Sequence, residues 1–530
     1  MKLTDHDLLQ FDERYLASLE PGSLLAVSKK LLSDLKESRE RLNQTPDNSS
    51  RPPSSRSPYL GIPEEGGVDS SNEHNEDVTN SSVEKGKSEK EDDDHRDGNG
   101  SGGSDSTGKS RFKKQKRKAG KQVGAPGYGR QQKIPAQREE IHKADKCVAC
   151  DAVIPLDIPF AAQIGFFVLE LISGTLEHPG LRLECTKHLF GDSICGCGHV
   201  TRTGPGIGER HVVEGRKDAT CLSEWRLIGP MLAAFIVALN LRMRLSRPRI
   251  REFLMDWFSL ELSAGTIDKC IRKAGLAVNP IYQDELIDEA RQSGLINVDE
   301  TPWKEKGVAR WLWVFVTANT VLFFVGRRTQ QVVLDILTEA YAGWLMSDGL
   351  MNYRIFSRRL RCLAHLIRKA RGLAESLDAE TKLFGDRTLE VLEFVVGQVR
   401  DGPDRTIFQP ILSDFKWLCE WHRAETPEGK LRSLAVEFLN DWDVIWMTLE
   451  HPDLPLTNNE AERALRHWVI ARLISHGTRT AEGSRVFTVL ASVIETCRRR
   501  KVSPWTYLAT VIAERKKGNP SPALPVPMVV

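Results

Sequence analysis

Residues 295–326 read LINVDETPWKEKGVARWLWVFVTANTVLFFVG, and this stretch decides the fold prediction. It begins with a short apolar run that ends at Asp299 and Glu300. Two further segments, 310–318 and 320–328, are rich in β-branched and aromatic residues, which is typical of strands. Because only the turn sequence ANT joins these two segments, we expect a hairpin there and three antiparallel strands in all.

A helix and a fourth apolar run follow the expected hairpin. Residues 330–340 predict a helix, and AGWLMSDGL (342–350) is an apolar run that again ends in an aspartate, Asp348. Three antiparallel strands, a helix and a fourth strand that ends in a carboxylate form the pattern of an RNase H-like α/β core. We predict this fold class for residues 291–480.

Asp299 and Asp348 both lie where an apolar run ends, so two buried strands would bring them together at one edge of the sheet. Like charges held that close raise each other's pKa unless a cation neutralises them. Oxygen-rich sites of this kind suit Mg²⁺ or Mn²⁺. Aspartate is also a common turn residue after a strand, and for either acid alone that interpretation stays open.

A later segment, LTNNEAERALRHW (456–468), adds Glu460 and Glu462 at the expected start of a helix. Thr457 with Glu460 fits a capping box, and Asn459 with Glu462 fits a second one. The two glutamates flank the expected buried face on opposite sides, so the helical pattern does not say which of them serves a metal site. That face consists of Ala461, Ala464, Leu465 and Trp468.

Residues 354–371, RIFSRRLRCLAHLIRKAR, contain no acid. Helical spacing assigns Ile355, Leu360, Leu363 and Leu366 to packing and the arginines to solvent or phosphate. A run without a compensating acid favours a polyanion as partner, with a solvated cationic face as the alternative. The candidate DNA contacts here and beside Glu462 are Arg358, Arg359, His365, Arg368, Lys369, Arg463 and Arg466.

Two close pairs of cysteines predict a zinc-ribbon-like segment at 139–205. Zn²⁺ prefers four tetrahedral thiolate or imidazole ligands, and CVAC and CGCG supply Cys147, Cys150, Cys195 and Cys197. Candidate substitutes for the second pair are Cys185, His188 and His199. Unpaired structural cysteines are the alternative interpretation.

The segment 206–290 predicts a helical DNA-binding region. Its residues 247–276 fit two helices joined by a turn at Leu262–Ser263, with Ser263 as the cap of the second helix. Two short helices joined by a tight turn suit a helix-turn-helix. A helical hairpin inside a protein core has the same pattern, so both interpretations stay open.

The N-terminal part combines a helix with a low-complexity linker. Leucines within residues 1–45 predict an amphipathic helix, either alone or in a short coiled coil. Residues 46–138 are poor in apolar side chains, which predicts a disordered linker. A basic run in this linker is either a solvated charge block or an arm that contacts phosphates; its candidate contacts are Lys113, Lys114, Lys116 and Arg117.

Length and composition fit this organisation. A chain of 530 residues exceeds one ordinary core, so several domains are expected. Ten cysteines in a chain this long fit a reduced protein with a metal site better than a disulfide scaffold. The first residues lack the apolar core of a signal peptide, and the longest apolar run, 227–239, is too short for a membrane span. We expect a cytoplasmic protein without membrane contact.

Taken together, several segments resemble the transposases of the IS66 family of bacterial insertion sequences. They are NVDETPWKEKG (297–307), LMSDGLMNY (345–353), RCLAHLIRK (361–369), LTNNEAERALR (456–466) and the run 477–508, with RLNQTPDNSSRPPSSRSP (41–58) and RKAGKQVGAPGYGR (117–130) upstream. The resemblance implies a DDE-type recombinase on an RNase H-like fold, preceded by a zinc-binding segment and a helix-turn-helix. It also implies an all-helical insertion, here at about 365–450, and leaves 481–530 as a C-terminal helical region and tail.

The resemblance also assigns roles. The catalytic acids would be Asp299, Asp348 and Glu462, since the third acid of the family directly precedes an arginine, here Arg463. They would hold two Mg²⁺ or Mn²⁺ ions for cleavage and strand transfer at the ends of an insertion sequence. Apart from the resemblance, Glu300 beside Asp299 either supports the site as a nearby acid or is an exposed turn residue, and Trp303 either packs in the core or stacks on an unpaired base.

The implied partners are double-stranded DNA, as terminal inverted repeats and as target, further copies of the chain, and accessory proteins of the same element. The implied location is the nucleoid in the bacterial cytoplasm. Two other functions fit the same residues: an RNase H-like nuclease or resolvase that only hydrolyses DNA, and a zinc-containing DNA-binding regulator without catalysis.

Overall fold

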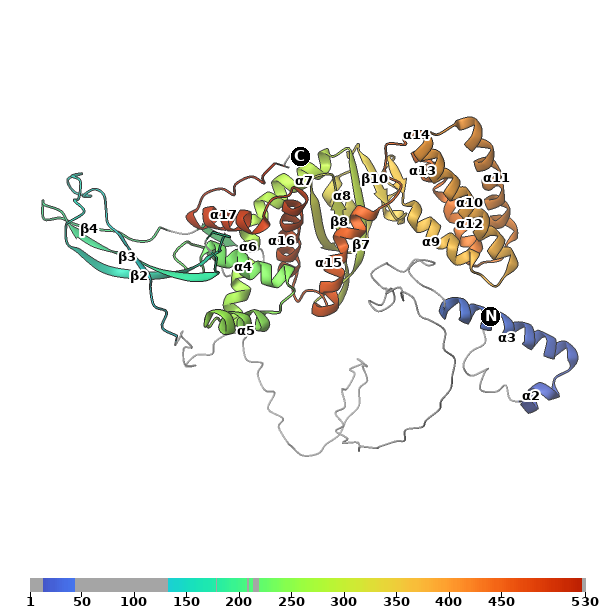
Figure 1. The fold of residues 1–530 in the computed structure, drawn as a ribbon, viewed down its shortest axis with the longest axis horizontal. Helices are drawn as coiled ribbons and strands as arrows, with labels where there is room; N and C mark the ends of the chain where they lie inside the picture. Colours follow the sequence, from blue (N-terminus) through green and yellow to red (C-terminus); the bar gives the residue numbers. More distant parts are fainter. Residues whose placement is uncertain (1–12, 43–131, 178, 207–208, 213–218, 527–530) are drawn as a thin grey trace, which may run out of the picture. The chain divides into compact units, whose positions relative to one another are not determined.

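A five-stranded sheet carries the segment that decides the fold prediction (Figure 1). The computed structural model describes residues 13–42, 132–177, 179–206, 209–212 and 219–526. Most of the expected linker 46–138 therefore lies outside the described residues, as do Lys113, Lys114, Lys116 and Arg117.

The sheet order is β11-β10-β7-β8-β9. The first three strands in sequence pair antiparallel, and they are β7 (Leu295–Glu305), β8 (Val308–Val316) and β9 (Val321–Gly326). Helix α8 (Gln330–Leu337) then leads to β10 (Trp344–Ser347), which pairs parallel with β7. The predicted succession of three antiparallel strands, a helix and a fourth strand is thus present, and β11 (Arg359–Arg361) extends the sheet beyond β10.

Two details differ from the expectation. Strand β7 does not end at Asp299 but continues to Glu305, because the two-residue turn Lys306–Gly307 lets β8 pair along its whole length. Asp299 and Glu300 therefore lie in the middle of a strand. The helix expected across 354–371 begins only with α9 (Leu363–Ala374), since β11 pairs with β10 and Ile355 is exposed.

Helices from the C-terminal part cover the sheet (Figure 1). Helix α15 (Asn459–Ser475) packs on β7 and β8, and α16 (Ala481–Arg499) packs on β9. Strand β9 is an edge strand, and α16 supplies hydroxyl groups to its free backbone. Ser492 Oγ accepts from Phe323 N at 2.8 Å, and Thr496 Oγ1 accepts from Val321 N at 3.0 Å.

The helices before the sheet share its hydrophobic core. They are α4 (Pro230–Val237), α5 (Arg247–Phe258), α6 (Ala264–Pro280) and α7 (Ile287–Gln292), with α17 (Pro504–Lys517) packed on α4 and α6. Ser263 caps α6 as predicted, because its Oγ accepts from Thr266 N at 3.0 Å. The C-terminal half of α6 is buried against α16 and α4, so that half is a core helix and not a face open to DNA.

A helical insertion with a hydrophobic core of its own separates β11 from α15. It consists of α9, α10 (Ala379–Asp401), α11 (Arg405–Glu425), α12 (Lys430–Asn440), α13 (Trp442–Ile445) and α14 (Met447–Glu450). The buried carboxylate of Asp441, between α12 and α13, lies 3.5 Å from Arg354 and from Arg359 and 3.7 Å from Arg361. This group of charges joins the insertion to β11.

The segment with the paired cysteines forms a second sheet of order β1-β3-β2, with β4 paired to β3. Its strands are β1 (Arg138–His142), β2 (Phe160–Ile172), β3 (Arg182–Ile194) and β4 (Val200–Arg202), followed by the hairpin of β5 (Glu209–Val212) and β6 (Ala219–Leu222). Near the N-terminus lie α2 (Glu13–Ser18) and α3 (Pro21–Leu42), and α3 is the helix expected within residues 1–45.

Candidate active site and metal centre

Asp299 on β7 and Asp348 directly after β10 lie at equivalent positions relative to the pairing of these two strands. The parallel register pairs Asn297 of β7 with Met346 of β10, two residues before each aspartate. Asp348 directly follows the last residue of β10, as predicted. The sheet therefore brings the two acids to the same place although 48 residues separate them in sequence.

A buried asparagine, Asn458, fixes the helix that carries Glu462 next to the two aspartates. Asn458, the residue before α15, donates from Nδ2 to the carbonyl of Val298 at 2.8 Å and accepts from Nδ2 of Asn297 at 3.1 Å. These bonds attach the start of α15 to β7 directly before Asp299, and Glu462 lies in the first turn of α15. Asn297 and Asn458 were not among the residues predicted from the sequence, although Asn297 is a polar residue inside the apolar run LINV.

Neither predicted capping box forms. Helix α15 begins at Asn459 with Asn458 as N-cap, and no side chain caps it. Glu460 instead pairs with Arg463 at 3.2 Å and with Arg499 of α16 at 2.9 Å. Glu462 turns to the opposite side, toward α9, because Arg368 binds it there. The two glutamates thus flank the buried face on opposite sides, as the helical pattern indicated.

Negative charge accumulates at the two aspartates. Burial, the charges of Asp348 and Glu300 and, more weakly, the charge of Glu462 raise the pKa of Asp299 well above its usual range. A divalent cation would relieve this repulsion. The carboxylate oxygens are also the ligand type that Mg²⁺ and Mn²⁺ prefer, so the chemistry of the donor set fits such an ion.

Glu300 is buried and paired, which corrects the expectation of an exposed turn residue. Its side chain is 1% exposed and accepts from Arg328 Nη2 at 2.8 Å and from Tyr353 Oη at 2.8 Å. Burial, followed by the charge of Asp348, raises the pKa of Glu300 to about 7, although Tyr353 and Arg328 oppose this shift. Trp303 is buried, stacks on Phe487 at 4.9 Å and belongs to the core.

Two of the predicted phosphate contacts lie at the third acid. Arg368 Nη2 donates to Glu462 Oε1 at 3.0 Å, and His365 Nε2 lies 3.7 Å from the same oxygen. Burial and the neighbouring charge of Arg368 lower the pKa of His365. A guanidinium that binds a carboxylate in this way can also bind a phosphate.

The other candidate DNA contacts differ in their surroundings. Arg359 is 13% exposed and pairs with Asp441, and Lys369 binds Glu437 at 2.7 Å. Arg358 donates to the carbonyl of Ala342 at 3.0 Å. Arg463 and Arg466 lie on the exposed side of α15. The structure therefore leaves Arg358, Arg463 and Arg466 more accessible than Arg359 and Lys369.

Part of the chain matches a known protein family. Residues 226–486 match the family model described as Transposase IS66 family. The chain belongs to the IS66 transposase family. The matched region contains Asp299, Asp348, Glu462 and the whole helical insertion.

A curated relative matches a shorter stretch. Over 66 residues the IS66-family chain is 36% identical to the uncharacterized protein y4jO of Sinorhizobium fredii (strain NBRC 101917 / NGR234). The match spans 12% of this chain and 21% of that protein, so the chain covers about a fifth of the relative's length.

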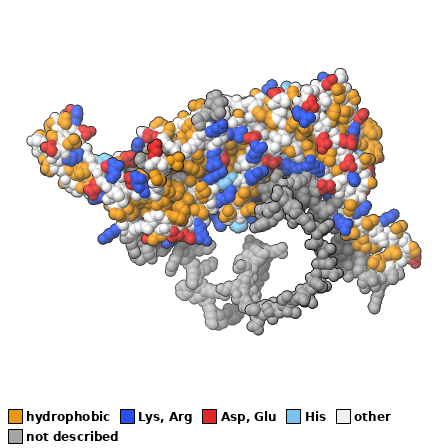
Figure 2. Space-filling model, viewed as in Figure 1, with side chains coloured by type: hydrophobic (Ala, Val, Ile, Leu, Met, Phe, Trp, Pro, Cys, Tyr) orange, Lys and Arg blue, Asp and Glu red, His pale blue; other side chains and the backbone are white. Residues whose placement is uncertain are grey.

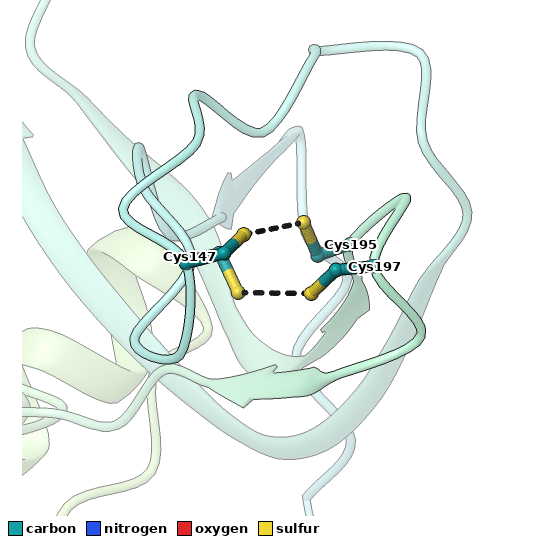
Figure 3. Close-up of side chains that lie close together, drawn as sticks. Cys147, Cys195 and Cys197 are labelled. Atoms are coloured by element: carbon teal, nitrogen blue, oxygen red, sulfur yellow. Dashed lines mark hydrogen bonds between the residues drawn. The ribbon is translucent and has the colours of Figure 1, made fainter.

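The four predicted cysteines of the IS66-family chain form a compact set outside the matched region (Figure 3). Sγ of Cys147 lies 3.8 Å from that of Cys197, and Sγ of Cys150 lies 3.6 Å from that of Cys195. Tetrahedral Zn²⁺ with bonds of about 2.3 Å to sulfur separates the sulfurs by about 3.8 Å. The set fits a zinc ion, and Cys185 and His199 lie outside it.

The three acids are arranged less tightly than the cysteines. Within the described part of the chain, two sets of metal-binding side chains have all ligand atoms within 4.8 Å of one another: the four cysteines, and Glu140 with His142 and His188. Asp299, Asp348 and Glu462 are not among these sets, and Glu462 is bound by Arg368 at 3.0 Å. Among the described residues, no helix is both long and apolar enough to cross a membrane.

Proposed function

We propose that this protein is a DNA transposase that uses Asp299, Asp348 and Glu462 to cleave the ends of an insertion sequence and to join them to target DNA. The observation that carries the proposal is the convergence of these acids. Asp299 lies on β7, Asp348 directly follows the parallel strand β10, and Glu462 lies on a helix that Asn458 attaches to β7.

The order of the sheet supports the same proposal. Three antiparallel strands followed by two parallel ones, in the order β11-β10-β7-β8-β9, are what an RNase H-like core requires. The helical insertion then lies between the second and the third acid, where the family resemblance implies it. We assign the catalytic domain to this sheet with α15, and we keep a DNA-binding role for the helices before it as part of the proposal.

The three acids would hold divalent Mg²⁺ or Mn²⁺, which lower the pKa of the attacking hydroxyl and stabilise the leaving oxygen in phosphoryl transfer. The chain's own residues have separate tasks. Asn458 and Asn297 fix Glu462 relative to Asp299. Arg368 and His365, which now face Glu462, would turn to the phosphate of the DNA backbone.

Charge on the surface favours DNA as the substrate. Lys and Arg side chains gather across the middle of the face in Figure 2, in the region that α15 occupies in Figure 1. Arg463, on α15, has a side chain that is 68% exposed. A basic surface beside a group of acids suits a phosphodiester substrate. The proposed substrates are the terminal repeats of the element and its target DNA, bound by more than one copy of the chain in the bacterial cytoplasm.

A strand-transfer assay tests the proposal. DNA that carries the sequences flanking this gene is incubated with the protein and Mg²⁺, and cleaved and joined products are separated. We expect Asp299→Asn, Asp348→Asn and Glu462→Gln each to lower cleavage by about 10³-fold or more, with binding of the DNA ends largely kept.

Glu460→Gln is the matched control, because Glu460 lies two residues from Glu462 but pairs with Arg463 and Arg499. It should keep activity and cost at most about 1 kcal/mol of stability. Cleavage retained in any one of the three acid variants would overturn the assignment. Cleavage without joining would indicate a nuclease, and DNA binding without cleavage in the wild type would indicate a regulator.

A further inference from the structure

A second group of metal-binding side chains lies on the strands that lead to the four cysteines. Glu140 and His142 belong to β1 and His188 belongs to β3. Their ligand atoms all lie within 4.8 Å of one another. The proposed DNA chemistry does not use these residues, and they are separate from the cysteine set.

The strand register explains how the three side chains meet. Strand β1 pairs parallel with β3, and Glu140 is the direct partner of His188. His142 lies two residues after Glu140, and because side chains alternate along a strand it points to the same face. Two side chains on the same face of β1 and one directly opposite on β3 thus bring three metal-binding groups together.

The distances suit a metal ion better than hydrogen bonds alone. Nδ1 of His188 lies 3.0 Å from Nε2 of His142 and 3.3 Å from Oε2 of Glu140. A neutral imidazole nitrogen carries either a proton or a lone pair, so Nδ1 of His188 could satisfy both neighbours only by sharing one proton between them. Nitrogen and oxygen ligands about 2.0–2.1 Å from a tetrahedral Zn²⁺ lie about 3.3 Å apart, close to both distances.

Aromatic rings pack against the two histidines of this group. The ring of Trp225 lies 5.1 Å from that of His142 and 5.0 Å from that of His188, and Phe190 stacks on His142 at 4.4 Å. The side chain of His188 is 14% exposed and that of Glu140 is 44% exposed. The rings hold the imidazoles in place, while the side of Glu140 stays open to a water molecule as a fourth ligand.

We propose that Glu140, His142 and His188 bind a second divalent transition-metal ion, with Zn²⁺ as the expected one, and that this ion ties the edge strand β1 to β3. The site is independent of the four cysteines. His188 precedes Cys195 by seven residues, and at about 3.3 Å per residue this corresponds to about 20 Å of strand. One ion therefore cannot serve both sets of ligands.

Metal content and Co²⁺ spectra of the full chain test this site. After saturation with Zn²⁺ and removal of free metal, we expect two zinc ions per chain by mass spectrometry of the metal. His142→Ala and His188→Gln should each leave one. After exchange for Co²⁺, these variants should keep the strong thiolate-to-cobalt charge-transfer band, because the cysteines remain. The double variant Cys147→Ser with Cys195→Ser should lose most of that band and still bind one Co²⁺.

His199→Ala is the matched control, because His199 is an exposed histidine in the same segment that belongs to neither set of ligands. It should keep both ions. One zinc per chain in the wild type, or two in His188→Gln, would overturn the proposal. Should the histidine variants fail to fold, Glu140→Gln decides, since its partly exposed side chain is replaced by one of equal size: the proposal requires at least tenfold weaker binding of the second ion, and unchanged affinity would sink it.

Discussion

Asn458 connects two parts of the proposed active site that are far apart in sequence. Its amide donates to the carbonyl of Val298 and accepts from Asn297, and its backbone N–H lies 3.2 Å from Sγ of Cys362. All of these partners are buried. A buried carbonyl or amide that loses its partner costs about 1–3 kcal/mol.

We therefore expect Asn458→Ala to lower the free energy of unfolding by about 2–3 kcal/mol and to reduce strand transfer although all three acids remain. Urea unfolding and the strand-transfer assay measure the two effects. Asn459→Ala is the control, since Asn459 is the adjacent asparagine and its side chain is exposed. Equal stability of the two variants would contradict the positioning role of Asn458.

Some of the site could be predicted residue by residue, and some could not. The placement of Asp348 after its strand followed from the apolar run. The burial of Glu300 did not, because it depends on Arg328 and Tyr353, which approach from 28 and 53 residues away. Asp299 and Glu300 are neighbours with the same charge, and only contacts made in the folded chain distinguish their environments.

At the scale of elements, α16 closes the exposed edge of β9. Ser492 Oγ accepts from Phe323 N at 2.8 Å and donates to the carbonyl of Thr488 at 2.7 Å. An open strand edge can pair with another chain. The helix hydroxyls bind the backbone groups that a further strand would otherwise bind. The same helix carries Thr496, which exchanges hydrogen bonds with both backbone groups of Val321.

Ser492→Ala should therefore destabilise the protein by about 1–3 kcal/mol, because it leaves the buried N–H of Phe323 without a partner. The change in urea midpoint measures this loss. Thr510→Ala is the matched control: its hydroxyl also donates to the carbonyl four residues earlier, at 3.0 Å, but Thr510 is exposed and its hydroxyl is not bonded to the edge strand β9. A loss as large in Thr510→Ala would mean that the helix, and not the strand edge, is weakened.

The strands of the sheet could be predicted where their own residues are typical of strands, and not where the strand depends on distant contacts. Strands β8 and β9 have continuous β-branched and aromatic runs and a short turn between them. Strand β11 has only Leu360 between two arginines, so the surrounding basic run indicated a helix. Its strand conformation comes from pairing with β10 and from the burial of Arg361 beside Glu437 and Asp441, neither of which local sequence reveals.

At the scale of the whole molecule, the segment with the four cysteines joins the large hydrophobic core at one end of its described strands. Leu169 of β2 and Cys185 of β3 are register partners and belong to the large hydrophobic core with α4. At the other end, the buried core around the four cysteines consists of Cys147, Ile154 and Cys195. So small a cluster buries little apolar surface, so the two loops would depend on a bound metal ion, which contributes about 10 kcal/mol or more in structural zinc sites.

We expect Cys150→Ser to loosen the metal-binding end and to leave the rest folded. In hydrogen exchange, the amides of Cys147, Cys195 and Gly198, which bond within the two cysteine loops, should lose protection. The amides of Leu169 and Gly229, which join β2 to the segment before α4, should keep it. His199→Ala should change neither group. Loss of protection in β7 and α15 as well would mean that metal binding is coupled to the proposed catalytic sheet. The small core around the four cysteines would then not be independent of the large hydrophobic core.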